Sequence, residues 1–224
     1  SAHNKFGTAS IRQVAHAIAT KLSPNHELIR QLYWRDFFLY LLFHYPTMLT
    51  NSARPQYETK TWNTNKKLFE AWCQGRTGIP IIDAGIRELN QTGYIHNRVR
   101  MLTASFLVKN LGIDWRKGAQ YFAQKLVDYD PAVNAGNWQW ISSTGYDAQP
   151  YFRVFNPWIQ QKKFDRECRY IKQWIPELSS FTPAQIHNPK TNYADTYPSP
   201  LVDTTAQAKE YIALIKFRLQ KYSD

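Results

Sequence analysis

The sequence has 224 residues, 43% of them hydrophobic and 20% charged, which is long and apolar enough for a buried core and excludes a disordered chain. Its 28 Lys and Arg residues against 17 Asp and Glu give a net charge of +11, which favours a polyanionic partner. Two cysteines are too few for a disulfide framework or a Cys-based zinc site, and we expect no metal. No stretch reaches the roughly 20 apolar residues of a membrane span. We therefore expect an intracellular protein of the cytoplasm or nucleus, neither secreted nor in a membrane.

The apolar periodicity is helical almost throughout and predicts an all-α domain with long loops. Ser23 and Pro24 predict the N-cap and first position of a helix that Pro46 ends, and Pro80 and Gly93 bound a second helix. Further helices are predicted at 96–109, 115–127, 164–174 and 204–222. Residues 151–155 are the best candidate for a strand. Residues 47–78 and 179–203 are predicted to be long loops, which are often functional.

Residues 128–140 carry two acids, two asparagines and two indoles, which predicts the lining of a polar, aromatic pocket rather than a core helix. In the helix expected from residue 96, Asn97 and Arg100 share a face, as do Asn97 and Met101. Arg100 is a suitable partner for Asp128 or Asp130, because a buried charge needs an opposite one. On the residues alone, a structural salt-bridge network and a binding site explain this pattern equally well.

Five segments, in this order, resemble the photolyase/cryptochrome family, and most of all its cyclobutane pyrimidine dimer DNA photolyases. They are YWRDF at 33–37, RTGIP at 76–80, IHNRVRM at 95–101, NAGNWQW at 134–140 and YFRVFNP at 151–157. The resemblance implies that residues 1–224 are the family's helical, FAD-binding catalytic domain. It also implies a fragment. The family's N-terminal α/β domain, which carries an antenna chromophore, and part of its FAD phosphate loop have no counterpart in these residues.

The resemblance also assigns roles around the cofactor. Asn134 matches the position that faces flavin N5, where an amide favours the reduced, active form of FAD, and Ser1 matches the last serine of the phosphate loop. Further positions that match cofactor-binding residues are Arg35, Asn97, Arg100, Phe122, Asp128 and Asp130. Three indoles match the family's electron-transfer chain, with Trp138 proximal to the flavin, Trp115 in the middle and Trp62 at the surface.

The substrate that the resemblance implies is UV-damaged DNA, with a pyrimidine dimer flipped out of the helix. Trp34 and Trp140 match the two indoles that sandwich the dimer, and Met101 matches an apolar contact to the same lesion. Arg98 and Arg153 match contacts to DNA phosphates. Asn97 matches a residue that is close to flavin and substrate alike.

One departure from the dimer enzymes is Gln31, which stands where they usually carry Glu, as in many (6-4) photolyases. However, Met101 stands where a (6-4) enzyme would carry a histidine near the lesion. A glutamine still donates and accepts hydrogen bonds at the thymine edge, so we expect light-driven dimer repair at lower efficiency. Two alternatives stay open. One is a cryptochrome-like photoreceptor or (6-4)-like protein with little dimer repair, and the other is a relative of the fold that binds nucleic acid without flavin.

Overall fold

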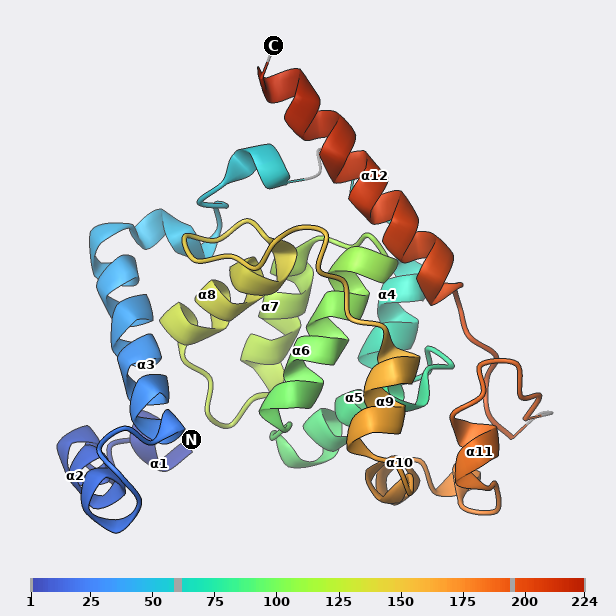
Figure 1. Cartoon of the computed structure of the whole chain (residues 1–224), viewed down its shortest axis with the longest axis horizontal. Helices are drawn as coiled ribbons and strands as arrows, with labels where there is room; N and C mark the ends of the chain where they lie inside the picture. Colours follow the sequence, from blue (N-terminus) through green and yellow to red (C-terminus); the bar gives the residue numbers. More distant parts are fainter. Residues whose placement is uncertain (1, 59–61, 194–195, 224) are drawn as a thin grey trace.

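The computed structural model describes residues 2–58, 62–193 and 196–223, and every regular element within these ranges is helical (Figure 1). The α-helices are α1 (Ala2–Lys5), α2 (Ile11–Lys21), α3 (Glu27–His44), α4 (Lys66–Cys73), α5 (Pro80–Thr92), α6 (Asn97–Ser105), α7 (Trp115–Lys125), α8 (Pro131–Ser142), α9 (Pro157–Phe164), α10 (Arg169–Trp174), α11 (Pro183–Ile186) and α12 (Thr204–Ser223). Short 3-10 helices are η1 (Pro46–Leu49), η2 (Pro55–Tyr57) and η4 (Pro176–Leu178), and η3 (Phe106–Asn110) is a π-helix. The all-α prediction is confirmed. Among the described helices, none combines the length and apolar character that crossing a membrane requires.

Helices α5 to α8 form the centre of the molecule, with α3 packed against α8 and with α9 and α10 packed against α5 (Figure 1). Pro80 occupies the first turn of α5, and Gly93 ends it with a φ of 70°, as predicted. The two helices α5 and α6 approach closely at Gly85, where an added Cβ would lie 2.2 Å from Cγ1 of Val99. The missing side chain therefore lets these two helices share the main core.

Helix α6 continues directly into the π-helix η3. His96 caps α6, because its Nδ1 accepts a hydrogen bond from the N–H of Arg98 at 3.2 Å. At the other end, the N–H of Leu111 donates to the carbonyl of Phe106 at 3.0 Å, which closes the wider π turn. All five residues of η3 are buried, including the polar side chains of Lys109 and Asn110. A π-helix of this kind often marks a functional site.

The prediction that residues 128–140 do not form a core helix is wrong. Helix α8 starts at Pro131, and the carboxylate of Asp130 caps it by accepting the N–H of Val133 at 3.1 Å. Its buried side includes four apolar side chains that are at most 4% exposed, Ala132, Ala135, Trp138 and Ile141. Two of these four side chains are alanines, so the apolar spacing was not visible among the polar residues between them.

Helix α3 starts later than predicted, at Glu27. Its cap is His26, whose Nδ1 accepts the N–H of Leu28 at 3.2 Å. Ser23 instead accepts the N–H of Asn25 in the turn before the helix. The end of α3 just before Pro46 is confirmed.

Helix α3 packs on α8 through a second, smaller apolar cluster. An added Cβ on Gly136 would lie 2.2 Å from the ring of Phe38, so the glycine makes room for this aromatic side chain. The buried members of the cluster are Phe38, Leu41, Met48, Ala132 and Ala135. The contact places one face of α3 against one face of α8.

Other sequence predictions are corrected in detail. The helix predicted at 164–174 starts only at Arg169, as α10; α9, which was not predicted, ends at Phe164, and Cys168, just before α10, adopts a left-handed φ of 54°. Residues 151–155 form a turn and irregular chain rather than a strand. The predicted loops contain short helices, with α4 and η2 inside 47–78 and α11 inside 179–203, and the pattern predicted neither α1 nor α2. The helices expected at 115–127 and 204–222 are confirmed as α7 and α12.

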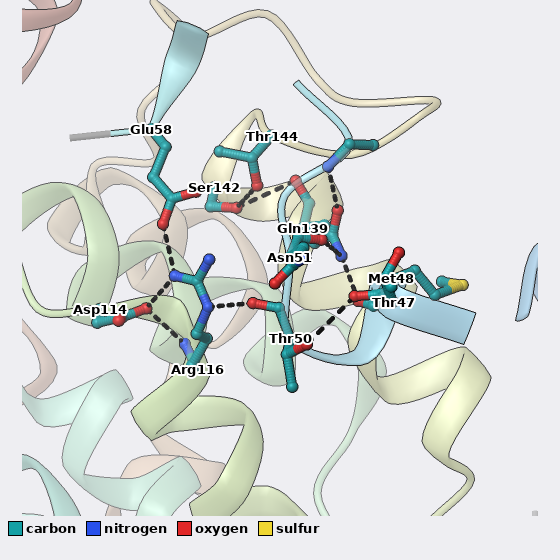
Figure 2. Close-up of polar contacts among 11 residues, drawn as sticks. Thr47, Met48, Thr50, Asn51, Glu58, Asp114, Arg116, Gln139, Ser142 and Thr144 are labelled. Atoms are coloured by element: carbon teal, nitrogen blue, oxygen red, sulfur yellow. Dashed lines mark hydrogen bonds and ion pairs between the residues drawn. The ribbon is translucent and has the colours of Figure 1, made fainter. Parts of the chain in front are cut away.

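Two side chains fasten the segment between α3 and α4 to the central helices (Figure 2). The guanidinium of Arg116, on α7, bonds Glu58 at 2.5 Å, Asp114 at 3.1 Å and the carbonyl of Thr50. The amide of Gln139, on α8, is buried and bonds three backbone groups, those of Met48, Asn51 and Ala53. Residues 48–58 are therefore held against α7 and α8.

Candidate functional site

A charged cluster lies between the start of α6 and the start of α8. Arg100 donates from Nη2 to both carboxylate oxygens of Asp128, at 3.1 and 3.3 Å, and from Nε to the carbonyl of Ile95. The Asp128 side chain is 9% exposed; burial raises its pKa, but the charge of Arg100 opposes this and the pKa lies below its ordinary value. Asp130 lies 3.6 Å from Nζ of Lys5. The pairing of Arg100 with Asp128 is thus confirmed.

Asn134 lies on α8, one turn after Asp130 and one turn before Trp138. It is half-buried, and its Nδ2 donates to the carbonyl of Ala119 on α7 at 3.0 Å. Its Oδ1 accepts no hydrogen bond from the described residues. The amide is therefore fixed at one end and keeps an acceptor for an N–H donor.

Two half-buried indoles stand on the two helices that pack together, Trp34 on α3 and Trp140 on α8. Trp34 contacts Phe37 and Phe38 in the smaller cluster, whereas Trp140 packs against the main core, as does Met101. No ring contact joins the two indoles in the described part of the chain. Each indole is partly exposed, so each keeps some surface that a ligand can contact. Gln31 is exposed one turn before Trp34.

The start of α6 presents a polar and cationic surface. Nδ2 of Asn97 lies 3.9 Å from Sδ of Met101, which confirms their predicted shared face. The guanidinium of Arg98 lies 4.1 Å from the ring centroid of Phe164 on α9, and Nζ of Lys163 lies 5.3 Å from the same ring. Two cations around one exposed aromatic ring suit a phosphate backbone and its bases.

The three indoles of the predicted electron-transfer chain lie in or against the main core. Trp138 and Trp115 are at most 2% exposed, and Trp62 is half-buried. Nε1 of Trp115 is buried without a hydrogen-bond partner, and the guanidinium of Arg116 lies 4.8 Å from the centroid of the same indole. The surroundings of Trp115 are therefore apolar on one side and cationic on another.

Sequence reasoning missed a further buried indole, Trp72 on α4. Its ring centroid lies 6.4 Å from that of Trp138 and 6.1 Å from that of Phe122, and its Nε1 donates to the carbonyl of Thr103. Phe122, predicted as a cofactor contact, is 3% exposed and lies in this aromatic group. The only available signal for Trp72 was the apolar spacing of α4, which lies in a segment predicted to be a loop.

Comparison with known proteins identifies the family. Residues 28–216 match the family described as the FAD binding domain of DNA photolyase. The chain belongs to this photolyase family. A deoxyribodipyrimidine photo-lyase of Buchnera aphidicola subsp. Baizongia pistaciae is 46% identical over 229 residues, which cover 96% of this chain and 48% of that protein.

Solved structures agree with the photolyase fold. An archaeal photolyase from Sulfolobus tokodaii, solved with two FAD molecules, superposes with a TM-score of 0.88 at 50% identity, over 96% of this chain and 49% of its own. A cryptochrome from Synechocystis superposes with a TM-score of 0.84 at 34% identity, over 95% of this chain and 47% of its own. The chain spans about half the length of the relatives it matches.

The residues present fit FAD, the cofactor of this photolyase family. The site offers a guanidinium, two carboxylates and a free amide oxygen, which suit the hydroxyl, N–H and carbonyl groups of the ribityl chain and flavin. These side chains belong to Arg100, Asp128, Asp130 and Asn134. Arg35 lies on α3, where it pairs with Asp36 at 3.0 Å rather than with a carboxylate of the charged cluster. Ser1 lies outside the described residues.

Arg153, the other predicted phosphate contact, lies in the irregular segment between α8 and α9. Its side chain is exposed, and its guanidinium lies 5.7 Å from the ring centroid of Phe155. Its backbone carbonyl bonds Lys109, a buried side chain that sequence reasoning missed. The spacing of the helix predicted at 96–109 places Lys109 at its end and gives no sign of burial.

Proposed function

We propose that this chain is the catalytic domain of a cyclobutane pyrimidine dimer photolyase, which repairs UV-damaged DNA with light. The observation that carries the proposal is one arrangement on α8. This helix carries the amide of Asn134, whose oxygen accepts no hydrogen bond from the described residues, and the half-buried indole of Trp140, and it starts three residues after Asp128, the partner of Arg100. A cofactor site and a stacking surface therefore share one helix.

FAD, when bound and reduced, would supply the chemistry: light-driven, reversible donation of one electron, which splits the two bonds between the pyrimidines with no net redox change. The side chains of this chain place the substrate. Trp34 and Trp140 stack on the extruded dimer, and Met101 gives it an apolar contact. The amide of Gln31 bonds the thymine edge.

Charged side chains hold the DNA backbone in this proposal. Arg98 and Arg153 contact phosphates, and the net charge of +11 attracts the polyanion. The oxygen of Asn134 accepts a hydrogen bond from an N–H group of the reduced cofactor. Trp138, Trp115 and Trp62 form the route that brings an electron to the site from the protein surface.

The proposal extends to the antenna chromophore and to the cellular compartment of the protein. An antenna chromophore belongs on the half of the family's polypeptide that this chain does not span. Both cysteines are free thiols, which suits a reducing compartment inside the cell.

A repair assay on this 224-residue chain tests the proposal. The chain is first mixed with FAD, and its absorption spectrum establishes that the flavin is bound and reduced by added reductant. An oligonucleotide with one thymine dimer is then exposed to blue light, and we expect restored thymines in light only. No restoration with reduced FAD bound overturns the proposal.

A binding assay separates repair from a cryptochrome-like photoreceptor. Trp140→Ala removes one stacking surface, and we expect it to weaken binding to dimer-containing DNA by about 1–3 kcal/mol. Trp174→Ala, another half-buried indole on α10, is the matched control and leaves the affinity unchanged. Equal affinity of Trp140→Ala and the unchanged chain favours the photoreceptor.

A further inference from the structure

Lys109 is a buried lysine without an acidic partner in the described part of the chain. It lies on the π-helix η3 and is 1% exposed. Its Nζ donates to Oγ of Ser143 at 3.1 Å and to the carbonyl of Arg153 at 2.9 Å. It also lies 5.6 Å from the ring centroid of Tyr211 on α12. All of these groups are neutral acceptors or ring faces.

Such a burial costs stability. Desolvation, together with the positive charge of Arg153, lowers the pKa of Lys109 to about 7. An apolar side chain of similar length would fill the space without this cost, and replacing buried charges in this way is often neutral or stabilising. Lys109 is therefore poorly explained as a contribution to core stability.

The bonds of Lys109 instead fix one surface segment. The carbonyl of Arg153 points inward to Nζ, while its side chain is exposed. The N–H of Arg153 donates to the carbonyl of Pro150 at 3.0 Å, so both backbone groups of this residue are bonded. A peptide held at both sides fixes the direction in which the side chain leaves the backbone.

The second acceptor links this segment to α8. Ser143 follows α8 in the left-handed region, with a φ of 68°, and the hydroxyl of Tyr211 donates to the carbonyl of Ser142. One ammonium group thus joins the end of α8, which carries Trp140, to the backbone of Arg153. Their relative position depends on this shared anchor.

We propose that Lys109 is a positioning residue, which holds Arg153 in register with α8 so that its guanidinium meets a DNA phosphate. The inference rests on the proposed function, since it needs DNA as the ligand. Lys109 itself is buried and makes no contact with DNA. It acts only through the backbone of residue 153.

The first test measures the affinity of the full chain, with FAD present, for a labelled duplex that contains one cyclobutane dimer, over a series of salt concentrations. Arg153→Gln removes one phosphate contact. We expect it to reduce the salt slope, which is the steepness with which the logarithm of the affinity falls with the logarithm of the salt concentration, by about 1. We expect Lys109→Met to weaken binding by roughly threefold to tenfold and to lower the salt slope in the same way. The double variant matches Arg153→Gln within about twofold, because both changes remove one contact. Lys67→Met removes an exposed lysine on α4 and is the matched control for net charge.

The second test needs no DNA. Trypsin cleaves after arginine, and the carbonyl of Arg153 is the one that Lys109 holds. We expect cleavage between residues 153 and 154 to be slow in the unchanged chain and about tenfold faster in Lys109→Met, because release of the segment raises the open population. Ser143→Gly keeps the backbone, since glycine adopts a φ of 68° freely, and removes one acceptor of the ammonium. We expect the DNA affinity and the cleavage rate of Ser143→Gly to lie between those of the unchanged chain and those of Lys109→Met.

The possible outcomes distinguish a failure of the proposed function from a failure of the inference about Lys109 alone. If the unchanged chain binds no DNA, the proposed function fails and this inference fails with it. If the unchanged chain binds DNA but Lys109→Met and Ser143→Gly leave both the salt slope and the cleavage after Arg153 unchanged, the inference alone is overturned. If Lys109→Met and Arg153→Gln weaken binding additively, Lys109 does not act through Arg153 and the inference is again overturned.

Discussion

Arg100 and Asp128 form a two-oxygen ion pair, with Nη2 at 3.1 and 3.3 Å from the carboxylate oxygens, between the start of α6 and the approach to α8. The aspartate side chain is 9% and the arginine side chain 27% exposed. The pair therefore holds together the two helices that carry Met101 and Asn134, and it also forms part of the proposed flavin site.

Asp128→Asn removes the charge and keeps the shape of the side chain. We expect a loss of about 1.5–3 kcal/mol in the free energy of unfolding at pH 7, since a charge-assisted bond is lost and Arg100 stays unpaired. The pKa of Asp128 is lowered in the folded chain, so the pair contributes fully above the unfolded-state pKa of about 3.9 and is lost as the pH falls through the folded pKa. Urea denaturation at pH 7 and pH 3 measures both effects. A loss at pH 7 that stays the same at pH 3 would contradict this assignment.

Gly118→Ala tests the close packing of α7 on Trp138. An added Cβ would lie 2.1 Å from Cη2 of the indole and 2.6 Å from Cδ2 of Leu107. We expect overpacking to cost about 1–3 kcal/mol of unfolding free energy, measured in urea. Because phenylalanine lacks the outer indole carbons, adding Gly118→Ala to Trp138→Phe costs much less than adding it to the unchanged chain. Equal costs in both backgrounds would exclude the indole as the obstacle.

The route of electrons to the flavin is tested with two equally buried indoles. Trp115→Phe interrupts the predicted chain, whereas Trp72→Phe removes an indole whose ring contacts Trp138 directly. We expect slower light-driven reduction of bound FAD only in Trp115→Phe, followed by absorption spectroscopy under blue light. Slow reduction in Trp72→Phe, with Trp115→Phe unaffected, would place the route through Trp72 instead.

Lys109 makes the stability of the chain depend on pH above neutrality. Its folded-state pKa of about 7 lies below the unfolded value of about 10.4, so the unfolded chain binds the proton more tightly in this range. The free energy of unfolding of the unchanged chain, minus that of Lys109→Met, should therefore rise with pH from about 7 to 10, by at most about 1.4 kcal/mol per pH unit. The groups that face Lys109 are Arg153, whose positive charge also lowers the pKa of the lysine, and Tyr211, whose pKa is raised by burial. A difference that is flat over this range would show that Lys109 is not desolvated.

Much of the fold follows from local sequence. Pro80 and Gly93 act within a single turn, by a fixed φ and by a left-handed one, so the bounds of α5 could be predicted. The shared face of Asn97 and Met101 needs only helical spacing. Capping is less certain, because His26 rather than Ser23 accepts the first free N–H of α3.

The sequence by itself determined the helical class, the family and the residue types of the site, because apolar spacing and motifs are properties of neighbouring residues. Only the tertiary structure decided which side chains meet across the chain. The burial of one side of α8 depends on the packing of Phe38 against Gly136. The contact between Trp72 and Trp138 likewise depends on how their helices pack. Lys109 and Arg153 are 44 residues apart, and spacing within one helix carries no information on such a contact. Burial and long-range partners depend on how the helices pack. The packing therefore decides how much free energy the burial of a polar side chain costs and which groups that side chain can bind.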